Sequence, residues 1–346
     1  MNDTLPGVSY VMPVLNEAVY IEKAILTVLG QDYAGTKELI LALGPSTDGT
    51  TEIVERLAAA DPRILTVHNP ETDIPVGLNK AIAASSHGII VRVDAHSELE
   101  PGYTTRAIET LERTGAANVG GIMRARGQTP FQLAAARGYN SKFGLGGGRY
   151  HGGAEEGPAE SAYLGVFRRA VLEEVGGFDE SLRRGEDWEL NLRIRAAGHV
   201  VWFDPELAVT YWPRENWNKL ARQFAATGTW RGELVRRYGG RNPWRFFVPP
   251  LLVVALAICV IVLVLQLTGV LHGMLAAVAS LVYLAPLTYV LLVLWLALVS
   301  DRGSHWRDRW LFTLVLPTMH LSWGSGFIVG LVRGARDTVD TSRTEI

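Results

Sequence analysis

The segment Val-Ser-Tyr-Val-Met-Pro-Val-Leu-Asn-Glu, residues 8–17, contains the strongest local indication of the fold class. Residues 8–12 form a short, mainly apolar run that ends at Pro13, which is typical of a buried strand. From Ile21 to Leu29 the apolar residues recur every three or four positions, as they do on one face of a helix. A strand followed directly by a helix predicts the start of an α/β fold.

The same alternation of strand and helix continues to residue 93. We predict further strands at 39–43, 64–67 and 89–93, with helices at 50–60 and 78–85 between them. Such alternation implies a mostly parallel sheet with helices on both faces. In a sheet of this kind, ligands bind outside the carboxyl ends of the strands.

Polar side chains gather at three of these predicted strand ends. Asn16 and Glu17 follow the first strand, residues 46–50 follow the second, and Asp94 and His96 follow the fourth. Any one of these groups is explained equally well as an ordinary helix cap or turn. Three groups at three strand ends favour a binding site.

Asp94 and His96 carry metal-binding atoms two residues apart. In an extended segment their side chains would point to the same side, so both could face one ion. A hard cation that bridges diphosphate oxygens would neutralise charge on a departing nucleotide. An imidazole in place of a second carboxylate suits Mn²⁺ better than Mg²⁺. The alternative is a turn aspartate beside a surface histidine.

A second polar segment, residues 185–190, precedes another predicted helix. Leu190, Ile194 and Ala197 share one helical face that ends at Gly198, which places Asp187 near the N-terminus of that helix. The helix dipole and the free backbone N–H groups favour a carboxylate there. The alternative function of Asp187 is an N-cap, worth about 1 kcal/mol of stability.

The composition limits what the protein can be. A length of 346 residues favours two structural units, and a net charge of −2 argues against a protein built to bind nucleic acid. The single cysteine, Cys259, excludes an intramolecular disulfide and a cysteine-cluster zinc site. From Phe246 to Ser300, 55 consecutive residues include no Asp, Glu, Lys or Arg. One helix crosses a bilayer with about 20 residues, so this stretch is long enough for two passes.

The two predicted passes run over about 246–266 and 274–299. Basic residues flank both ends of this hairpin, and basic loops prefer the cytoplasmic side, so both ends should lie there. A third uncharged segment, 310–332, contains His320 and several small or polar residues. If it spans, its basic tail lies outside, against the positive-inside tendency; a re-entrant or interfacial helix would avoid that conflict.

Residues 216–240 alternate aromatic and basic side chains. Such a segment can form interfacial helices with its cations towards anionic lipid, although a pair of core helices fits the pattern equally well.

Five motifs together resemble the inverting family-2 glycosyltransferases. In order, they are Pro13-Val14-Leu15-Asn16-Glu17, Ser46-Thr47-Asp48-Gly49-Thr50, Asp94-Ala95-His96, Gly177-Phe178-Asp179 and Glu186-Asp187-Trp188. The resemblance covers roughly residues 6 to 240. With the hairpin appended, the chain looks most similar to the succinoglycan-type exopolysaccharide glycosyltransferases.

The resemblance implies a cytoplasmic GT-A domain over residues 1–240 and a membrane domain with two or three spanning segments over 241–346. It also implies a nucleotide-diphosphate sugar donor and a divalent cation, Mn²⁺ or Mg²⁺. By motif match, the donor-binding residues would be Pro13, Leu15, Asn16, Glu17, Asp48 and Asp94. Asp94 and His96 would hold the metal, Asp187 would be the catalytic base, and Glu186 and Trp188 would shape the acceptor site.

This sequence departs from the family pattern in three places. Leu43-Gly44-Pro45 stands where the family usually carries an acidic residue that contacts the base, which leaves the donor nucleotide open. His96 replaces the final Asp of the metal motif, which leaves the metal preference open. The Gln-x-x-Arg-Trp motif of the processive synthases is absent, so we expect single additions.

The expected function is transfer of a sugar to a lipid-linked or cell-envelope glycan acceptor at the cytoplasmic face of the plasma membrane. One alternative is a synthase that loads sugar directly onto polyprenyl phosphate. A second is a catalytically silent membrane scaffold that keeps the fold. The expected partners are the donor, the acceptor and the lipid bilayer, with no nucleic acid; the sequence does not predict an oligomeric state.

Overall fold

The computed structural model describes residues 5–144, 155–239, 242–299, 306–335 and 338. The chain divides into two compact units. Unit 1 comprises Met1–Arg126 and Gly148–Trp212, and unit 2 comprises Gly127–Gly147 and Pro213–Ile346.

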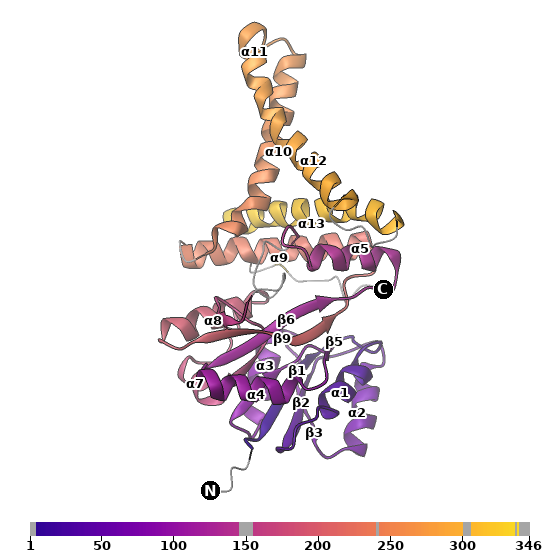
Figure 1. The fold of residues 1–346 in the computed structure, drawn as a ribbon, viewed down its shortest axis with the longest axis vertical. Helices are drawn as coiled ribbons and strands as arrows, with labels where there is room; N and C mark the ends of the chain where they lie inside the picture. The colour runs from indigo at the N-terminus through magenta and orange to yellow at the C-terminus, as the bar shows by residue number, and fades with distance from the viewer. Residues whose placement is uncertain (1–4, 145–154, 240–241, 300–305, 336–337, 339–346) are drawn as a thin grey trace. The chain divides into compact units, whose positions relative to one another are not determined.

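Unit 1 alternates strands and helices as the apolar pattern predicts (Figure 1). The elements up to residue 93 match the predicted segments to within about four residues. They do so because each segment has the apolar pattern of a buried strand or of an amphipathic helix. The elements are β1 (Val8–Val14), α1 (Ile21–Leu29), β2 (Lys37–Leu43), α2 (Thr50–Ala60), β3 (Ile64–His68), α3 (Ile74–Ala84), β4 (Ile89–Arg92), β5 (Ser97–Leu99), α4 (Tyr103–Thr114), β6 (Asn118–Ala125), β7 (Gly157–Pro158), β8 (Tyr163–Arg168), α7 (Arg169–Glu174), α8 (Glu186–Ala196) and β9 (Val201–Tyr211).

The strands of unit 1 form one sheet in the order β3-β2-β1-β4-β8-β6-β9-β5, with β7 paired to β9. The first four strands along the chain are parallel neighbours, as predicted. The later part of the sheet is mixed, because β8 runs antiparallel to both β4 and β6, and β5 and β7 run antiparallel to β9. The sheet is therefore a mixed, Rossmann-like sheet.

Two apolar layers cover the two faces of this sheet. One layer contains residues of α1, α2 and α4 together with Tyr10 and Leu39; the other contains residues of α3, α7 and α8 together with Val11 and Ile40. The alternation follows from the two-residue period of a strand. In β4, Ile90 belongs to the α3/α7/α8 layer, so Arg92, two residues later, is directed to the same face.

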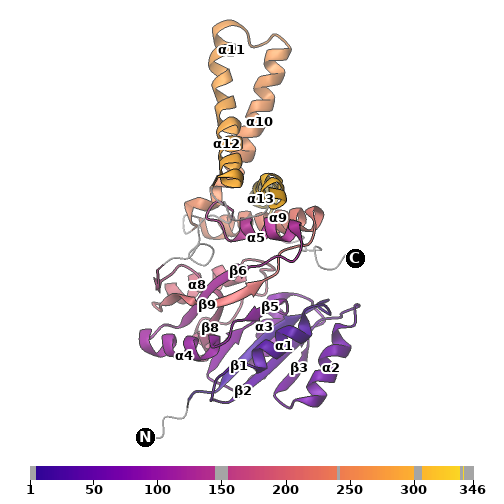
Figure 2. The ribbon, with the colours of Figure 1, turned by 45° about the vertical axis from the view of Figure 1, so that its right-hand side comes forward.

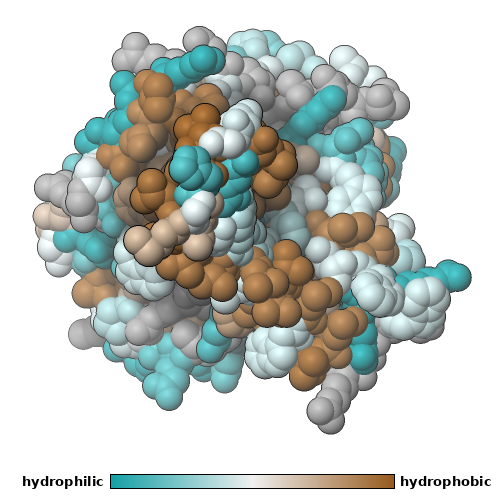
Figure 3. Space-filling view, turned by 90° about the horizontal axis from the view of Figure 1, so that it is seen from above, coloured by the Kyte–Doolittle hydropathy of each residue, from teal (hydrophilic) through white to brown (hydrophobic). Residues whose placement is uncertain are grey.

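Unit 2 is helical among the residues that the structure describes. Seen along the hairpin, apolar side chains gather in the centre of the view (Figure 3). Three segments are long and apolar enough to cross a membrane: Trp244–Leu267, Gly273–Leu298 and Trp306–Arg333. The elements of the unit are α5 (Pro130–Tyr139), α9 (Trp217–Tyr238), a 3-10 turn (Trp244–Phe247), α10 (Val248–Leu267), α11 (Gly273–Ala279), a second 3-10 turn (Ser280–Tyr283), α12 (Leu284–Leu298) and α13 (Trp306–Arg333).

Candidate active site

The loop after β1 is tied to the loop after β2. Asn16 has a left-handed backbone, with φ of 54°, which asparagine adopts more readily than most residues. Its backbone N–H donates to Ser46 Oγ at 3.0 Å, and its side-chain Oδ1 accepts from the Thr47 N–H at 2.8 Å. Two of the three predicted polar groups therefore lie together at the carboxyl edge of the sheet.

Asp48 makes the same connection from the other loop. Its carboxylate accepts from the Ala18 N–H at 3.0 Å, from the Thr50 N–H at 3.1 Å and from Thr50 Oγ1 at 2.5 Å. Burial raises the pKa of Asp48, but the hydrogen bonds from Thr50 and Ala18 outweigh burial and lower that pKa overall. Asp48 is thus an ionised anchor of both loops, a geometry that suits a supporting place in a donor pocket.

Pro13 and Leu15 lie half-buried at the end of β1. The Gly44 N–H donates to the Val14 carbonyl at 2.8 Å, and a Cβ built on Gly44 would lie 3.0 Å from Leu15 Cδ1. The segment that lacks the family's acidic residue is therefore packed closely against Leu15. The contact of Pro13 and Leu15 with a nucleotide stays a prediction.

The segment from Asp94 to His96 is a turn. β4 ends at Arg92, the Ser97 N–H donates to the Asp94 carbonyl at 2.9 Å, and β5 begins at Ser97. The prediction that Asp94 and His96 share one extended segment is wrong, because this turn reverses the chain between them. The two side chains that lie two residues apart and point to the same side are instead those of Arg92 and Asp94. Arg92 Nη2 donates to Asp94 Oδ1 at 3.3 Å.

His96 lies against the first polar group. Its Nδ1 is 3.3 Å from Glu17 Oε1, and its ring packs edge-on against Tyr211 with the centroids 5.7 Å apart. Both His96 and Glu17 are buried. Three strand ends therefore contribute to one neighbourhood: those of β1, β4 and β9.

Asp94 and His96 offer a carboxylate oxygen and an imidazole nitrogen to a cation. Within the described ranges, no group of three or more His, Cys, Asp and Glu side chains could hold a metal ion by itself. Mg²⁺ and similar cations are commonly held by one or two protein ligands together with substrate phosphates and water. Each residue offers an atom of the kind that such a cation binds, Asp94 from beside Arg92 and His96 from beside Glu17.

A buried arginine joins the turn after β4 to the first turn of α8. The Arg92 guanidinium, only 4% exposed, binds Asp94 Oδ1 at 3.3 Å, Glu186 Oε1 at 2.9 Å and Asp187 Oδ1. It also lies 5.8 Å from the centroid of the Phe178 ring. One cation thus holds together three of the carboxylates that the motifs single out.

Asp187 lies in the first turn of α8, as predicted. The N-cap residue of that helix is Gly185, with φ of 80°, and the Asp187 carboxylate turns to Arg92. The N-cap alternative for Asp187 is therefore wrong. Burial raises the pKa of Asp187; Arg92 opposes the rise, while Glu186 and Asp94 add to it. Since 28% of its side chain stays exposed, Asp187 combines access with the basicity that a general base needs.

Glu186 and Trp188 flank Asp187 and are both buried. The Glu186 carboxylate binds the Arg92 guanidinium, so Glu186 helps to hold Arg92 in place beside Asp187. The acceptor-shaping roles of both residues stay predictions.

Arg92 is the site residue that the motifs do not reveal. Its signal is nonetheless visible in the sequence: a single charge inside Ile89-Ile90-Val91-Arg92-Val93, a strand whose other members are apolar. A fully buried arginine requires ionic partners. Which carboxylates supply them depends on α8, almost a hundred residues away.

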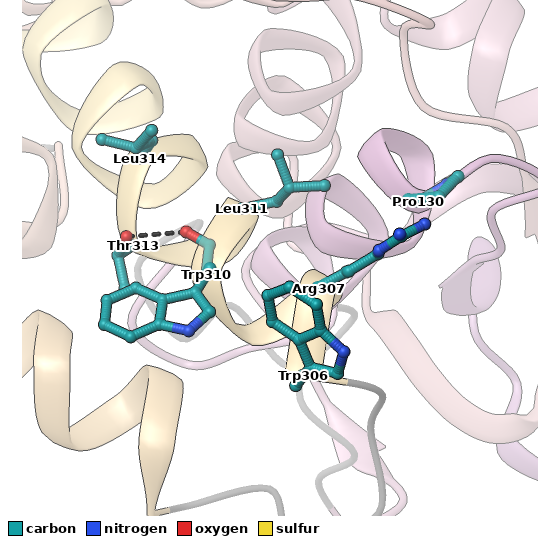
Figure 4. A pocket seen from close by; sticks show the side chains of 7 residues that line it. All are labelled: Pro130, Trp306, Arg307, Trp310, Leu311, Thr313 and Leu314. Carbon is teal, nitrogen blue, oxygen red and sulfur yellow. Dashed lines mark hydrogen bonds between the residues drawn. The ribbon is translucent and has the colours of Figure 1, made fainter.

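A separate apolar groove of about 530 Å³ lies within unit 2. Trp306, Arg307, Trp310 and Leu314 of α13 line it, and Figure 4 shows Arg307 directed towards Pro130 of α5. It contains none of the motif residues, so it is not part of the candidate active site.

Comparisons with known proteins identify the family and the fold. The family model described as glycosyl transferase family 2 matches residues 9–176. The succinoglycan biosynthesis protein ExoA of Rhizobium meliloti (strain 1021) is 32% identical, over 92% of each chain. The chain belongs to glycosyl transferase family 2.

A second relative of this family member comes from Methanococcus voltae. It is named dolichyl N-acetyl-alpha-D-glucosaminyl phosphate 3-beta-D-2,3-diacetamido-2,3-dideoxy-beta-D-glucuronosyltransferase and is 24% identical over 69% of this chain and 77% of its own. Among solved structures, the mannosyltransferase PcManGT of Pyrobaculum calidifontis, in complex with GDP-Man and Mn²⁺, matches with a TM-score of 0.58. That match has 19% identity and covers 96% of this chain and 90% of the other, which shows a shared fold.

The predicted family, GT-A fold class and enzyme class are confirmed. The protein is a glycosyltransferase of polysaccharide or glycan biosynthesis, with candidate membrane helices after its catalytic sheet. An inverting mechanism fits the family.

Proposed function

We propose that this family-2 glycosyltransferase moves a sugar from a nucleotide diphosphate to a lipid-linked or cell-envelope glycan at the cytoplasmic face of the plasma membrane. The observation that supports the proposal most is the bridge made by Arg92. It holds Asp94, at the strand end where a donor would bind, and Asp187, at the N-terminus of α8, on one guanidinium.

The reaction would be a single displacement at the anomeric carbon. Asp187 accepts the proton of the acceptor hydroxyl while that oxygen forms the new glycosidic bond. The bond to the diphosphate oxygen breaks, its electron pair leaves with the nucleoside diphosphate, and the configuration inverts. A divalent cation held by Asp94 and His96 would supply charge neutralisation for that leaving group.

Donor binding is assigned to the carboxyl edge of β1 and β2. Asn16 and Asp48 fix the two loops there, and we propose that Pro13, Leu15 and Glu17 complete the pocket. Mn²⁺ is the favoured cation because His96 offers an imidazole nitrogen at the position where the family's motif ends in a carboxylate. The mannosyltransferase of the same fold was likewise solved with GDP-Man and Mn²⁺.

The proposed acceptor has a lipid tail that stays in the bilayer. Two apolar helices and their basic flanks support a cytoplasmic catalytic domain beside that membrane. The name of the Methanococcus relative describes transfer to a dolichyl-phosphate-linked sugar, which supports a lipid-linked acceptor over bare polyprenyl phosphate.

The deciding experiment compares Asp187→Asn with wild type in detergent or nanodiscs. We expect transfer to fall by 10² to 10⁴-fold, the range typical of a lost general base, while a nucleotide-sugar thermal shift with Mn²⁺ persists. Glu55→Gln, an exposed acid-to-amide change on α2, is the control and should keep full activity. Undiminished transfer by Asp187→Asn would remove Asp187 from the mechanism.

The acceptor is tested separately by offering polyprenyl diphosphate sugar and polyprenyl phosphate to the wild-type enzyme. The proposal expects product only from the first. Product from polyprenyl phosphate alone would identify a polyprenyl-phosphate glycosyl synthase. If the protein binds a nucleotide sugar but forms product with none of the acceptors, the silent scaffold would be favoured.

A further inference from the structure

The third apolar helix of unit 2 differs from the other two in how much protein surrounds it. In α13, 44% of the most apolar window is buried inside the protein, against 17% in each of the two hairpin segments. A helix that crosses a bilayer as part of a small hairpin exposes most of its surface to lipid, as α10 and α12 do. The burial of α13 therefore needs its own explanation.

Glycines bring α13 into backbone contact with α9. A Cβ added to Gly326 would overlap the Ala225 carbonyl oxygen, and one added to Gly330 would overlap that of Thr229. From the other helix, a Cβ on Gly228 would overlap the Trp323 carbonyl, and one on Gly232 would overlap that of Phe327. Residue numbers rise together along both helices, so α9 and α13 run parallel in continuous contact.

α9 is too charged to cross a membrane. The six charged residues of α9 are Lys219, Arg222, Arg231, Glu233, Arg236 and Arg237. The longest uncharged run between them is residues 223–230, which spans about 12 Å of helix. The hydrocarbon core is about 30 Å thick. A helix that lies parallel to α9 and in contact with it cannot cross either.

We propose that α13 does not span the membrane but lies with α9 in the interfacial layer, at the foot of the α10–α12 hairpin. Its partner there is the headgroup and upper acyl region of the bilayer. The chain then crosses the membrane twice, and its C-terminal tail stays on the side of the catalytic unit. This inference does not depend on the proposed reaction.

The foot of the hairpin supports this placement. A Cβ on Gly324, in the middle of α13, would overlap the Pro249 carbonyl at the start of α10. Arg137 of α5 donates to the Ala297 carbonyl, the last turn of α12, at 3.2 Å and stacks 4.4 Å from the Phe312 ring of α13. α13 is thus joined to the ends of both crossing helices, and both views show it lying crosswise to them (Figures 1 and 2).

The outer face of α13 has the character of an interfacial helix. Its exposed side chains follow helical spacing on the side opposite α9, and most are apolar: Trp306, Trp310, Leu314, Val329 and Val332. Tryptophan is enriched where a membrane meets water. The apolar groove of Figure 4 lies at this end, with the Arg307 cation directed across it, as suits anionic lipid headgroups.

The positive-inside conflict also disappears. With α13 in the interface, Arg333 at its end lies on the same side as Arg245 before the hairpin.

Cysteine accessibility tests the sidedness. Cys259 is the only cysteine, so Cys259→Ala provides a background for single cysteines. We would place Thr338→Cys in the tail, Glu55→Cys on the catalytic unit and His272→Cys in the hairpin turn, and label sealed vesicles of known orientation with a membrane-impermeant maleimide. Thr338→Cys should label only in the orientation that labels Glu55→Cys. Labelling in the orientation of His272→Cys would overturn the proposal.

Spin-label depth provides a second, independent measurement. Leu314→Cys, Ser325→Cys and Val332→Cys lie on the exposed side of α13, and their depth follows from collisions with oxygen and with a polar nickel chelate. A helix in the interface gives one shallow depth at all three positions. A spanning helix makes Ser325 deeper than Val332 by about 10 Å. Shielding of all three labels from both reagents would show a protein partner on this face and would also overturn the proposal.

Discussion

At the residue scale, the site depends on how one buried cation is shared. Arg92 is surrounded by Asp94, Glu186 and Asp187, and its planar guanidinium can satisfy several carboxylates at once in fixed directions. Removal of such a cation leaves buried like charges together, which is strongly destabilising. We therefore regard Arg92 as a positioning residue that sets the angle of the Asp187 carboxylate.

Arg92→Lys tests this positioning. Lysine keeps the charge but cannot reach three carboxylates in one plane, so we expect kcat to fall about 10- to 100-fold while KM for the donor changes little. Arg106→Lys is the matched control, because Arg106 is also shared by three carboxylates, Asp204, Glu206 and Glu156. Equal losses of kcat in both variants would assign Arg92 a purely structural role.

Asp204 is a buried carboxylate that, like the partners of Arg92, is paired with an arginine; here the pair stabilises the fold. It is fully buried and accepts from Arg106 Nε and Thr110 Oγ1, each at 2.7 Å. Burial raises its pKa, but these hydrogen bonds outweigh burial and lower the pKa below its ordinary value. A lowered folded-state pKa stabilises the protein above the unfolded pKa, near 3.9, and this contribution is lost as the pH falls through the folded value.

Asp204→Asn should therefore cost about 2 kcal/mol of unfolding free energy at pH 7, because charge-assisted hydrogen bonds are replaced by neutral ones. The difference from wild type should shrink below about pH 4, where the carboxylate of the unfolded chain becomes protonated, and disappear at the lower pH where the folded carboxylate is protonated too. Thermal unfolding in detergent across this pH range measures both effects. A difference that is independent of pH would contradict the role given to the ionised carboxylate.

At the element scale, the close approach of α9 and α13 depends on residues without side chains. Gly330 places its Cα against the Thr229 carbonyl, where no Cβ fits. In packed interiors, an added methyl group forces backbone shifts. The helix pair is thus more sensitive to small enlargements than the exposed hairpin.

Gly330→Ala should lower the unfolding free energy by about 2 kcal/mol, within the range for overpacked sites. Gly88→Ala is the control, since a Cβ there meets nothing within 4 Å. Thermal unfolding of both variants in the same detergent provides the comparison. Equal melting temperatures would show that α9 and α13 are not in close contact.

At the scale of the whole molecule, the chain combines the sheet of a family-2 glycosyltransferase with a hairpin of two candidate membrane helices. Two apolar segments of 24 and 26 residues are each long enough to cross the hydrocarbon core. Their outward side chains are almost entirely apolar, which makes release into water costly.

Membranes that contain the full chain should therefore retain it after extraction with alkaline carbonate or high salt, because two spanning helices hold it without ionic contacts. A peripheral protein held by the basic residues of α9 alone would be released by salt. Appearance of the intact chain in the carbonate supernatant would contradict the membrane-spanning hairpin.

Local patterns in the sequence were enough to predict the alternating strands and helices of unit 1, the position of Asp187 in a first helical turn, and the two hairpin segments. Each of these is written in a local pattern: a two- or 3.6-residue period, or an uncharged run of sufficient length. The five motifs also predicted the family, because their order and spacing can be read directly from the sequence.

Which side chains contact one another could be known only from the three-dimensional fold. The partners of Arg92 come from α8, 94 and 95 residues along the chain, and the turn at residues 94–97 sets Asp94 beside Arg92 and His96 beside Glu17. The apolar run of α13 fits a spanning helix until its glycines are seen against the backbone of the charged helix α9. A local pattern shows which apolar face a segment is able to bury. Contacts between segments that are distant in the sequence determine what that face is buried against.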